Sequence, residues 1–270
     1  MRRGRRVKTK TTSRLSSVQN ALRILKSFST YQPVQKVSEL AVELGLAKST
    51  VSRLVATLVS EGFLIKDDDS RGYRLGLSVL TLGGIVTNNL EIYKEAAPVL
   101  NKLVNNTGET AHLAILDGID TIYIHKEECH HPVRILTHIG RKNPSYCTST
   151  GKVLLAFNDD YLVEEIIKQG LRSFTSNTIT DPILLKSELD QVRKQNYALS
   201  TEELTEGTKS IAAPIRDHRG KVVCAVNIVG PIQRMNDYHI PEMAKRVIEA
   251  GNEASKRLGY DERYFKKLRF

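Results

Sequence analysis

Two short segments of the chain gather small hydroxyl groups and cations at spacings that suit anion binding. They are Lys48-Ser49-Thr50 with Ser52, Arg53 and Thr57 behind it, and Thr148-Ser149-Thr150-Gly151 before Lys152. Hydroxyls and cations on one exposed helix face can reach base edges and phosphates in the major groove of DNA. Hydroxyls at a helix start lie beside unpaired N–H groups, where the helix dipole favours an anion. The first segment predicts a nucleic-acid interface and the second a small-anion site.

The elements around the first segment have the pattern of a helix-turn-helix. Apolar residues at helical spacing predict helices over about 16–29, 37–44 and 48–61. Gly45 and Gly62 follow the second and third helices, where a left-handed residue suits a sharp turn. On the first helix the predicted inward residues are Val18, Ala21, Leu22, Leu25 and Phe28. An amphipathic helical hairpin that binds no nucleic acid is the alternative interpretation.

A predicted β-hairpin follows and would form a wing. Strands are expected at 63–66 and 73–75, joined by a turn over 67–72. Its candidate contacts to phosphates or the minor groove are Lys66, Arg71 and Arg74. The consecutive aspartates at 67–69 would repel the DNA backbone and limit affinity. We expect phosphate contacts to set affinity and register, and Arg53 with its neighbours to set sequence preference.

The net charge of +10 lies almost entirely in the first third of the chain. Residues 1–80 hold 15 Lys and Arg against 6 Asp and Glu, whereas residues 81–270 hold 25 against 24. Such a basic module attracts phosphate backbones through counterion release, although a solvated basic surface has the same composition. Residues 1–14 predict a disordered basic arm that adds weak phosphate contacts or only solubility, and residues 263–270 a basic tail.

The remaining two thirds predict a linker helix and a mixed domain. Residues 77–107 read as a helix broken near Asn88-Asn89 and around Pro98, with an apolar stripe that packs on a second subunit or on its own core. Strands are expected at 110–116, 121–126, 133–138, 197–201, 209–216 and 221–229, with helices from Thr148 and over 159–169, 183–195 and 238–258. This mixture predicts an α+β domain over 108–262, after a DNA-binding domain over 15–76.

Several linked motifs, in order along the chain, resemble one family. They are S-V-x-x-A-L-x-I-L at 17–25, L-A-x-E-L-G-L-A-K-S-T-V-x-R-L at 40–54, L-x-x-E-G-F at 58–63, Y-R-L-G at 73–76, Y-C-T-S-T-G-K at 146–152, G-T-K-S-I-A-A-P-I-R-D at 207–217 and V-V-C-A-V-N-I-V-G-P at 222–231. Together they resemble the IclR family of bacterial and archaeal transcription regulators. The resemblance implies a winged helix-turn-helix, a linker helix and a C-terminal GAF-like effector domain that binds a small metabolite.

The resemblance also implies further pocket residues and an oligomer. Carried over by motif, the effector contacts beyond 148–151 are Ser200, Thr208, Ser210 and Asn227. A pocket this rich in hydroxyls would suit an organic or sugar acid. We expect a repressor that binds a palindromic operator in double-stranded DNA as a homodimer or tetramer. A helix N-cap whose N–H groups are already satisfied is the alternative interpretation of 148–151.

Other classes of protein fit the sequence less well. No apolar run approaches the roughly 20 residues of a membrane span, and the charged start is unlike a secretory signal, so a cytoplasmic location is expected. Cys129 with His130 and His131 lacks the paired spacing of a closed zinc site, and we expect no metal or cofactor. An enzyme with Cys147 as nucleophile lacks an assignable base. An architectural or RNA-binding role lacks aromatic stacking residues in 1–80.

Overall fold

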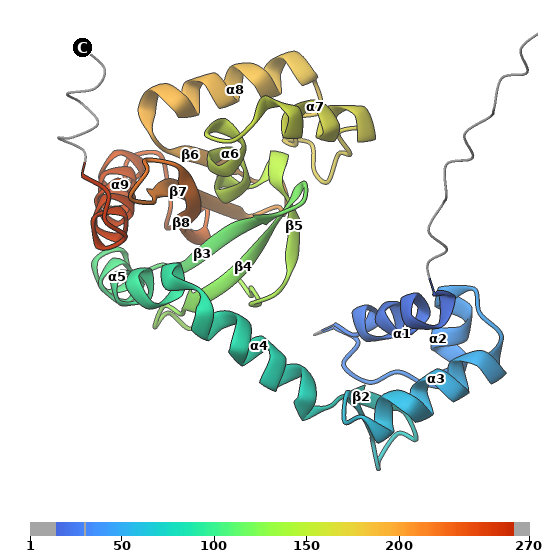
Figure 1. Ribbon diagram of the computed structural model, residues 1–270. Coiled ribbons are helices and arrows are strands. Elements are labelled where there is room, and N and C mark those ends of the chain that lie inside the picture. Colours follow the sequence, from blue (N-terminus) through green and yellow to red (C-terminus); the bar gives the residue numbers. More distant parts are fainter. Residues whose placement is uncertain (1–14, 30, 262–270) are drawn as a thin grey trace, which may run out of the picture. The chain divides into compact units, whose positions relative to one another are not determined.

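The computed structural model describes residues 15–29 and 31–261 and divides into two compact units, residues 1–86 and 87–270 (Figure 1). The predicted basic arm at 1–14 and the predicted tail at 263–270, together with residue 30, lie outside the described residues. Within the described part, no helix combines the length and apolarity needed to cross a lipid bilayer.

The N-terminal unit is a winged helix-turn-helix. Its helices are α1 (Ser16–Ser27), α2 (Val37–Leu44) and α3 (Lys48–Ser60), followed by β1 (Leu64–Lys66) and β2 (Tyr73–Leu75). Gly45 adopts φ 65° after α2, which confirms the predicted turn. The small core is centred on Ile24, Leu40, Val51 and Leu64, all 0% exposed.

The buried face of α1 differs from the predicted one. Val18 and Leu22 are more than half exposed, whereas Ile24, absent from the predicted face, is fully buried. The helix has two neighbouring apolar stripes, and the core between three short helices has room for only one of them. The stripe left outside consists of Leu15, Val18 and Leu22.

The wing is held to the helices by one extra bridge. β1 and β2 pair antiparallel with Ile65 opposite Arg74, and the backbone of Gln35 exchanges two hydrogen bonds with Tyr73. The Gln35 side chain, 3% exposed, donates from Nε2 to the carbonyl oxygen of Ser27 at 2.7 Å. The segment before α2 therefore connects the wing to the end of α1.

The predicted linker helix is two helices, α4 (Leu77–Asn89) and α5 (Glu91–Thr107). The interruption at Leu90 confirms the expected break near 88–89, but the break expected at Pro98 is wrong, because α5 runs through it. An interior proline costs about 3 kcal/mol. Burial of Ala96, Val99, Leu100 and Leu103 in the C-terminal core offsets this cost.

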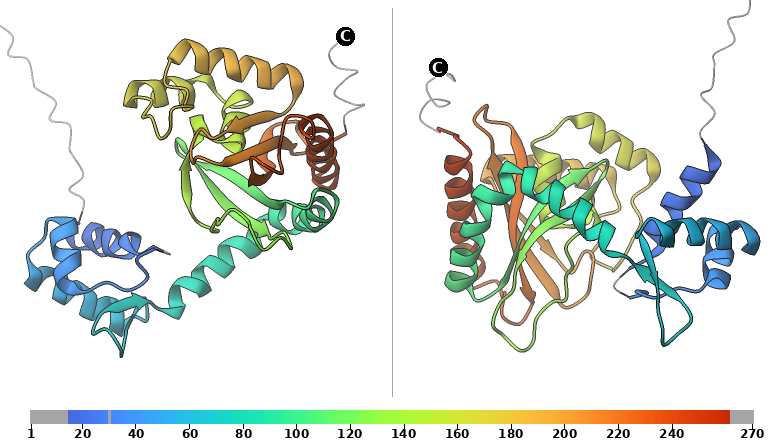
Figure 2. Two further views of the ribbon diagram at one scale, coloured as in Figure 1. Left: turned by 180° about the vertical axis from the view of Figure 1, so that it is seen from behind. Right: turned by 60° about the horizontal axis from the view of Figure 1, so that its bottom comes forward.

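The C-terminal unit is an α+β domain around one antiparallel sheet. The strand order is β5-β4-β3-β8-β7-β6. Figure 2 shows α5 and α9 on one face of the sheet and α6, α7 and α8 on the other, each face with its own apolar core. The bounds are β3 (Thr110–Asp117), β4 (Asp120–Glu127), β5 (Lys142–Pro144), α6 (Ser149–Ala156), α7 (Asp160–Gln169), α8 (Pro182–Gln195), β6 (Ala198–Thr201), β7 (Thr208–Arg216), β8 (Val222–Pro231) and α9 (Ile240–Arg257).

One predicted strand does not form. Residues 133–138 are irregular, and the edge of the sheet beside β4 is taken by β5 instead. Val133 and Leu136 are more than two-thirds exposed, so the apolar residues that suggested a strand bury little surface. Thr137 is instead anchored by side chains: His112 contacts its hydroxyl, and Lys126 Nζ donates to its carbonyl oxygen at 2.9 Å.

Candidate functional site

The predicted DNA-contact side chains are all exposed on the N-terminal unit. The set comprises Lys48, Ser49, Thr50, Ser52, Arg53 and Thr57 on α3, with Lys66, Arg71 and Arg74 on the wing. On α3 the buried side chains Val51, Val55 and Leu58 define the opposite face. Because apolar residues recur at helical spacing and are buried, the short polar residues of α3 lie together on its exposed face. A helix that enters a DNA groove needs such a face.

The cations of α3 are available for a ligand. In the part of the chain that the structure describes, Lys48 and Arg53 have no carboxylate partner. The Thr57 hydroxyl donates to the carbonyl oxygen of Arg53 at 3.1 Å, so Thr57 offers an outside partner its oxygen lone pairs and its methyl group. The face therefore presents donors from Arg53 and Lys48 beside an acceptor from Thr57.

The three wing aspartates do not share one role. Asp67 accepts hydrogen bonds from the Ser70 hydroxyl at 2.5 Å and from its N–H at 3.0 Å, which closes the turn. These bonds, led by the hydroxyl, lower the pKa of Asp67, and the Arg74 charge lowers it further. Asp68 and Asp69 are exposed. Only these two remain as free negative charges beside the basic residues of the wing.

A cavity of about 70 Å³ lies in the C-terminal unit, and half of the predicted effector residues line it. These are Thr148, Ser200, Thr208 and Ser210. The other polar lining residues carry no motif that would single them out in the sequence. They come from β4, from the 135–141 segment, from β5 and from the loop after β6. They are Tyr123, Thr137, Arg141, Asn143 and Thr205.

The other predicted effector residues, Ser149, Thr150, Gly151 and Asn227, are not among the residues that line the cavity. Thr148 caps α6 by accepting from the Gly151 N–H at 3.2 Å, as in an ordinary helix cap. A Cβ at Gly151 would lie 2.0 Å from the Ser145 carbonyl oxygen, so glycine is needed there for close backbone packing. The Ser149 and Thr150 hydroxyls are buried without a hydrogen bond of ordinary geometry.

A buried polar cluster contacts two of the cavity-lining residues, Tyr123 and Thr137. His112 on β3 is 0% exposed, stacks on Tyr123 with ring centroids 4.3 Å apart, and contacts Asn227 Oδ1 through Nδ1 at 3.1 Å. Its Nε2 lies 2.6 Å from the Thr137 hydroxyl. Burial lowers the pKa of His112 to about 3 and raises that of Tyr123 to about 12. Both rings are therefore neutral near neutral pH.

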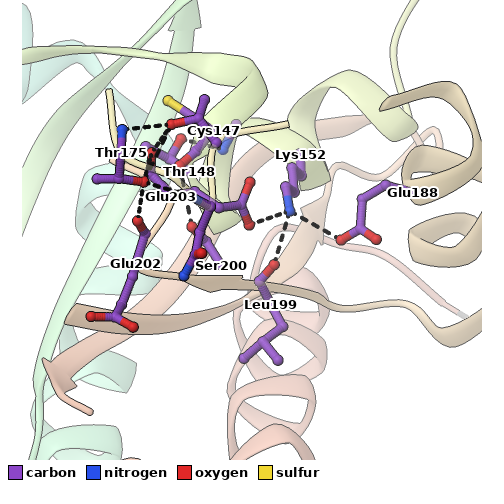
Figure 3. A network of polar contacts seen from close by, with 12 residues as sticks. Cys147, Thr148, Lys152, Thr175, Glu188, Leu199, Ser200, Glu202 and Glu203 are labelled. Atoms are coloured by element: carbon purple, nitrogen blue, oxygen red, sulfur yellow. Dashed lines mark hydrogen bonds and ion pairs between the residues drawn. The ribbon is translucent and has the colours of Figure 1, made fainter. Parts of the chain in front are cut away.

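Lys152, the last residue of the second motif, is fixed inside the protein (Figure 3). Its side chain is 1% exposed, and Nζ donates to Glu203 at 2.6 Å, to Glu188 at 3.1 Å and to the Leu199 carbonyl oxygen at 3.1 Å. Burial raises the pKa of Glu203, opposed by the Lys152 charge. Lys152 thus ties α6 to residues 199–203, which carry Ser200 at the cavity.

The cysteines have surroundings unsuited to catalysis or metal binding. Burial first, and the Glu203 charge second, raise the pKa of Cys147 to about 12, whereas a nucleophilic cysteine requires a lowered pKa. Cys129 is buried in the apolar core, while the neighbouring His130 and His131 are exposed. Across the described residues, no three His, Cys, Asp or Glu side chains converge on a point where they could hold a metal.

Comparison with known proteins agrees with this architecture in both units. Residues 17–68 match the IclR helix-turn-helix domain, and residues 85–256 match the C-terminal domain of the bacterial transcriptional regulator IclR. The regulator XynR of Escherichia coli (strain K12) is 32% identical over 247 residues, covering 91% of this chain and 98% of XynR.

Two further relatives cover most of their own length. The transcriptional repressor AllR of Salmonella typhimurium is 33% identical over 225 residues, covering 83% of this chain and 82% of AllR. The crystal structure of an IclR-type regulator from Alicyclobacillus acidocaldarius is 28% identical with a TM-score of 0.81, covering 92% of this chain and 100% of that one. With a winged helix-turn-helix in one unit and an α+β domain that holds a polar cavity in the other, this chain belongs to the IclR family of transcription regulators.

Proposed function

We propose that this regulator is a repressor that binds a palindromic operator and is controlled by a small organic or sugar acid. The observation that carries the proposal is a cavity lined by hydroxyls with a single free cation, Arg141, in a chain whose other unit exposes a reading helix. The relative AllR is a repressor by name, and that supports the sign of regulation. DNA binding also supports a cytoplasmic location.

On the DNA, we assign base reading to α3 and phosphate contacts to the wing. Arg53 and Lys48 supply charged donors with no partner among the described residues, and Ser49, Thr50, Ser52 and Thr57 are short enough to approach base edges. Lys66, Arg71 and Arg74 lie on a separate projection, suited to the phosphate backbone or the minor groove.

In the cavity, we assign the carboxylate of the effector to Arg141. Within the described residues no side-chain carboxylate pairs with its guanidinium, although its charge lowers the pKa of Tyr123 across the cavity. A carboxylate would be held in two parallel hydrogen bonds by such a group. Ser200, Thr208, Ser210 and Thr148 would contact the rest of the molecule, while 149–151 and Asn227 support the wall from behind.

We infer a homodimer as the smallest DNA-binding form, with a tetramer as the larger possibility. The apolar stripe of α4 is exposed: Leu77 and Leu80 are 76% and 72% exposed, and Ile85 54%. Contiguous apolar surface of this kind is typical of protein–protein contacts. In a two-fold dimer the same apolar stripe of α4 on a second copy would pack against this one. The two copies of α3 would then be related by the two-fold axis, as the half-sites of a palindromic operator are.

The test begins with operator fragments selected from random DNA by the purified full-length protein. Fluorescence anisotropy then measures operator affinity with and without a panel of carboxylic acids. We expect at least one acid to shift wild-type affinity, and Arg141→Gln to abolish that shift while leaving effector-free operator affinity unchanged. A wild-type affinity that no acid changes, or an acid response that survives Arg141→Gln, contradicts the proposal.

A further inference from the structure

We propose that the cavity selects acids that carry hydroxyl groups, because four of its seven lining hydroxyls already donate their protons inward and leave acceptors for the ligand. This inference rests on the proposed acid-binding function of the same cavity. The selectivity depends on which partner in each hydrogen bond supplies the proton, and the residue types alone do not determine this.

Three lining hydroxyls donate their protons to backbone carbonyl oxygens. The Thr148 hydroxyl donates to the Pro144 carbonyl oxygen at 3.2 Å, and Ser200 donates to the Cys147 carbonyl oxygen at 3.2 Å. Thr208 donates to the Thr205 carbonyl oxygen at 2.6 Å. A hydroxyl has one proton, so each of these groups is left with oxygen lone pairs for any further partner.

The fourth hydroxyl belongs to Thr137, and the tautomer of His112 determines that its proton is donated to the His112 ring. Asn227 faces His112 with Oδ1, and its contact with the Tyr123 hydroxyl lowers the pKa of Tyr123, as a donated amide N–H does. An oxygen acceptor beside Nδ1 requires the His112 proton to be on Nδ1. In a neutral imidazole Nε2 is then the acceptor, so Thr137 donates to it across 2.6 Å.

The segment that carries Thr137 is held in place for this role. Lys126 Nζ donates to the Thr137 carbonyl oxygen at 2.9 Å and pairs with Glu128 at 2.6 Å. The full burial of His112, which keeps the ring neutral, preserves this tautomer across the physiological pH range. The direction of the Thr137 proton is thus set by groups outside the cavity.

The consequence is a cavity with one cation and four lining hydroxyls that can only accept from a ligand. A hydroxy acid can place its carboxylate on Arg141 and donate its hydroxyl protons to these four oxygens. At these positions a keto acid of the same length brings its carbonyl lone pairs against hydroxyl lone pairs, and a deoxy acid leaves the acceptors unpaired. A site built to bind a ligand hydroxyl strongly rejects the analogue that lacks it.

The test compares acids that differ only in hydroxyl groups. Isothermal titration calorimetry of the full chain uses glycerate, lactate, pyruvate and propionate, with gluconate and hexanoate as a longer pair so that size is not decisive. We expect each hydroxyl to tighten binding by about tenfold, which corresponds to about 1.4 kcal/mol. We expect glycerate to bind most tightly of the three-carbon acids, and pyruvate to gain nothing over propionate.

Two variants of Thr137 separate recognition from folding. Thr137→Val should reduce the preference for lactate over propionate about tenfold, while Thr137→Ser, which keeps the hydroxyl, should retain it. Equal affinities for hydroxylated and deoxy acids in the wild type, or an unchanged preference in Thr137→Val, overturn the inference. Equal affinities that Arg141→Gln abolishes would leave the acid-binding function standing, whereas no binding of any acid would overturn that function and this inference together.

Discussion

The two units place their functional groups in opposite ways. On the N-terminal unit the assigned side chains are all exposed, and the charged groups of Lys48 and Arg53 have no carboxylate partner among the described residues. In the C-terminal unit the motif at 148–152 is buried, and Thr148, Gly151 and Lys152 all serve the packing or capping of α6. A motif can therefore mark an exposed surface in one unit and the scaffold beside a cavity in the other.

The contrast is sharpest between two lysines, each in the first turn of a helix: Lys48 is the first residue of α3, and Lys152 is the fourth residue of α6. Lys48 begins α3 in solvent, whereas Lys152 on α6 is 1% exposed among Glu203, Glu188 and a carbonyl oxygen. A solvated cation contributes little to stability and is free for a ligand. A buried cation with two carboxylates cannot be removed without leaving those charges unpaired.

Replacing each lysine by methionine is the strongest way to break this comparison. Lys152→Met should lower the free energy of unfolding of the C-terminal unit by about 3–5 kcal/mol, because Glu203 is left buried without its counter-ion. Lys48→Met should change stability by less than about 0.5 kcal/mol and weaken DNA binding. Urea unfolding of the full chain, with hydrogen exchange on α6 to identify the unit, measures both.

A second substitution checks the assigned cause. Adding Glu203→Gln to Lys152→Met should restore part of the lost stability, because the unpaired carboxylate is then neutral. If Lys152→Met unfolded at the same urea concentration as the wild type, the buried ion pairs would not hold residues 199–203 in place.

Acid should also affect the two units differently, because all seven histidines follow residue 86. The folded-state pKa of His112 is lowered to about 3 from an ordinary 6.5, chiefly by burial. Between these values the unfolded chain binds the additional proton, so this group makes stability fall as the pH drops below about 6.5. Its contribution approaches about 1.4 kcal/mol per pH unit in the lower part of this window.

Hydrogen exchange between pH 6.5 and pH 5 separates the units, since carboxylates titrate mainly below this range. We expect protection to decrease in β3 and β8, with little change in α2 and α3 after correction for intrinsic exchange rates. His112→Asn should flatten the dependence in the C-terminal unit. Equal pH slopes in the wild type and this variant would assign the effect to another group.

The N-terminal assignments depend on local sequence pattern and the cavity depends on contacts between distant segments, and this difference explains how much could be predicted from the sequence. The helices at 37–44 and 48–60, and the exposure of Arg53, follow from a local apolar period, so they were predicted correctly. The cavity depends on contacts between distant segments. Arg141 and Thr137 meet Ser200 and Thr208 only after the sheet has formed, and no spacing along the chain brings them together.

The errors have the same origin. Ile24 replaced Val18 and Leu22 in the core because tertiary packing chose between two apolar stripes on one helix. Pro98 stays within α5 because the sheet and α9 bury the residues around it. Gly151 suggested a ligand from sequence, but in the structure the close neighbour is the Ser145 backbone.

A base-reading role for Arg53 predicts a loss confined to DNA binding. Arg53→Ala should weaken specific operator binding by about 1–3 kcal/mol if the guanidinium makes a bidentate base contact. Its stability should stay within about 0.5 kcal/mol of the wild type, because the side chain is exposed. Anisotropy titrations on operator and scrambled DNA measure the effect, with Arg246→Ala on α9 as a control.

A loss for Arg53→Ala that is equal on operator and scrambled DNA would assign this residue to phosphate contact. A loss matched by the α9 control would remove α3 from recognition altogether.

The smallest expected effects distinguish neighbouring aspartates of the wing. Asp68→Asn and Asp69→Asn remove exposed charges, so each should raise affinity for DNA about two- to threefold at low salt, with the gain vanishing as salt screens the charge. Asp67→Asn weakens the bonds to Ser70 that close the turn, so it should lower stability by about 0.5–1.5 kcal/mol. Salt-dependent anisotropy and thermal unfolding of the full chain measure the two quantities separately. If all three substitutions raised affinity equally and left stability unchanged, Asp67 would be a third free charge, and the turn would be held by its backbone alone.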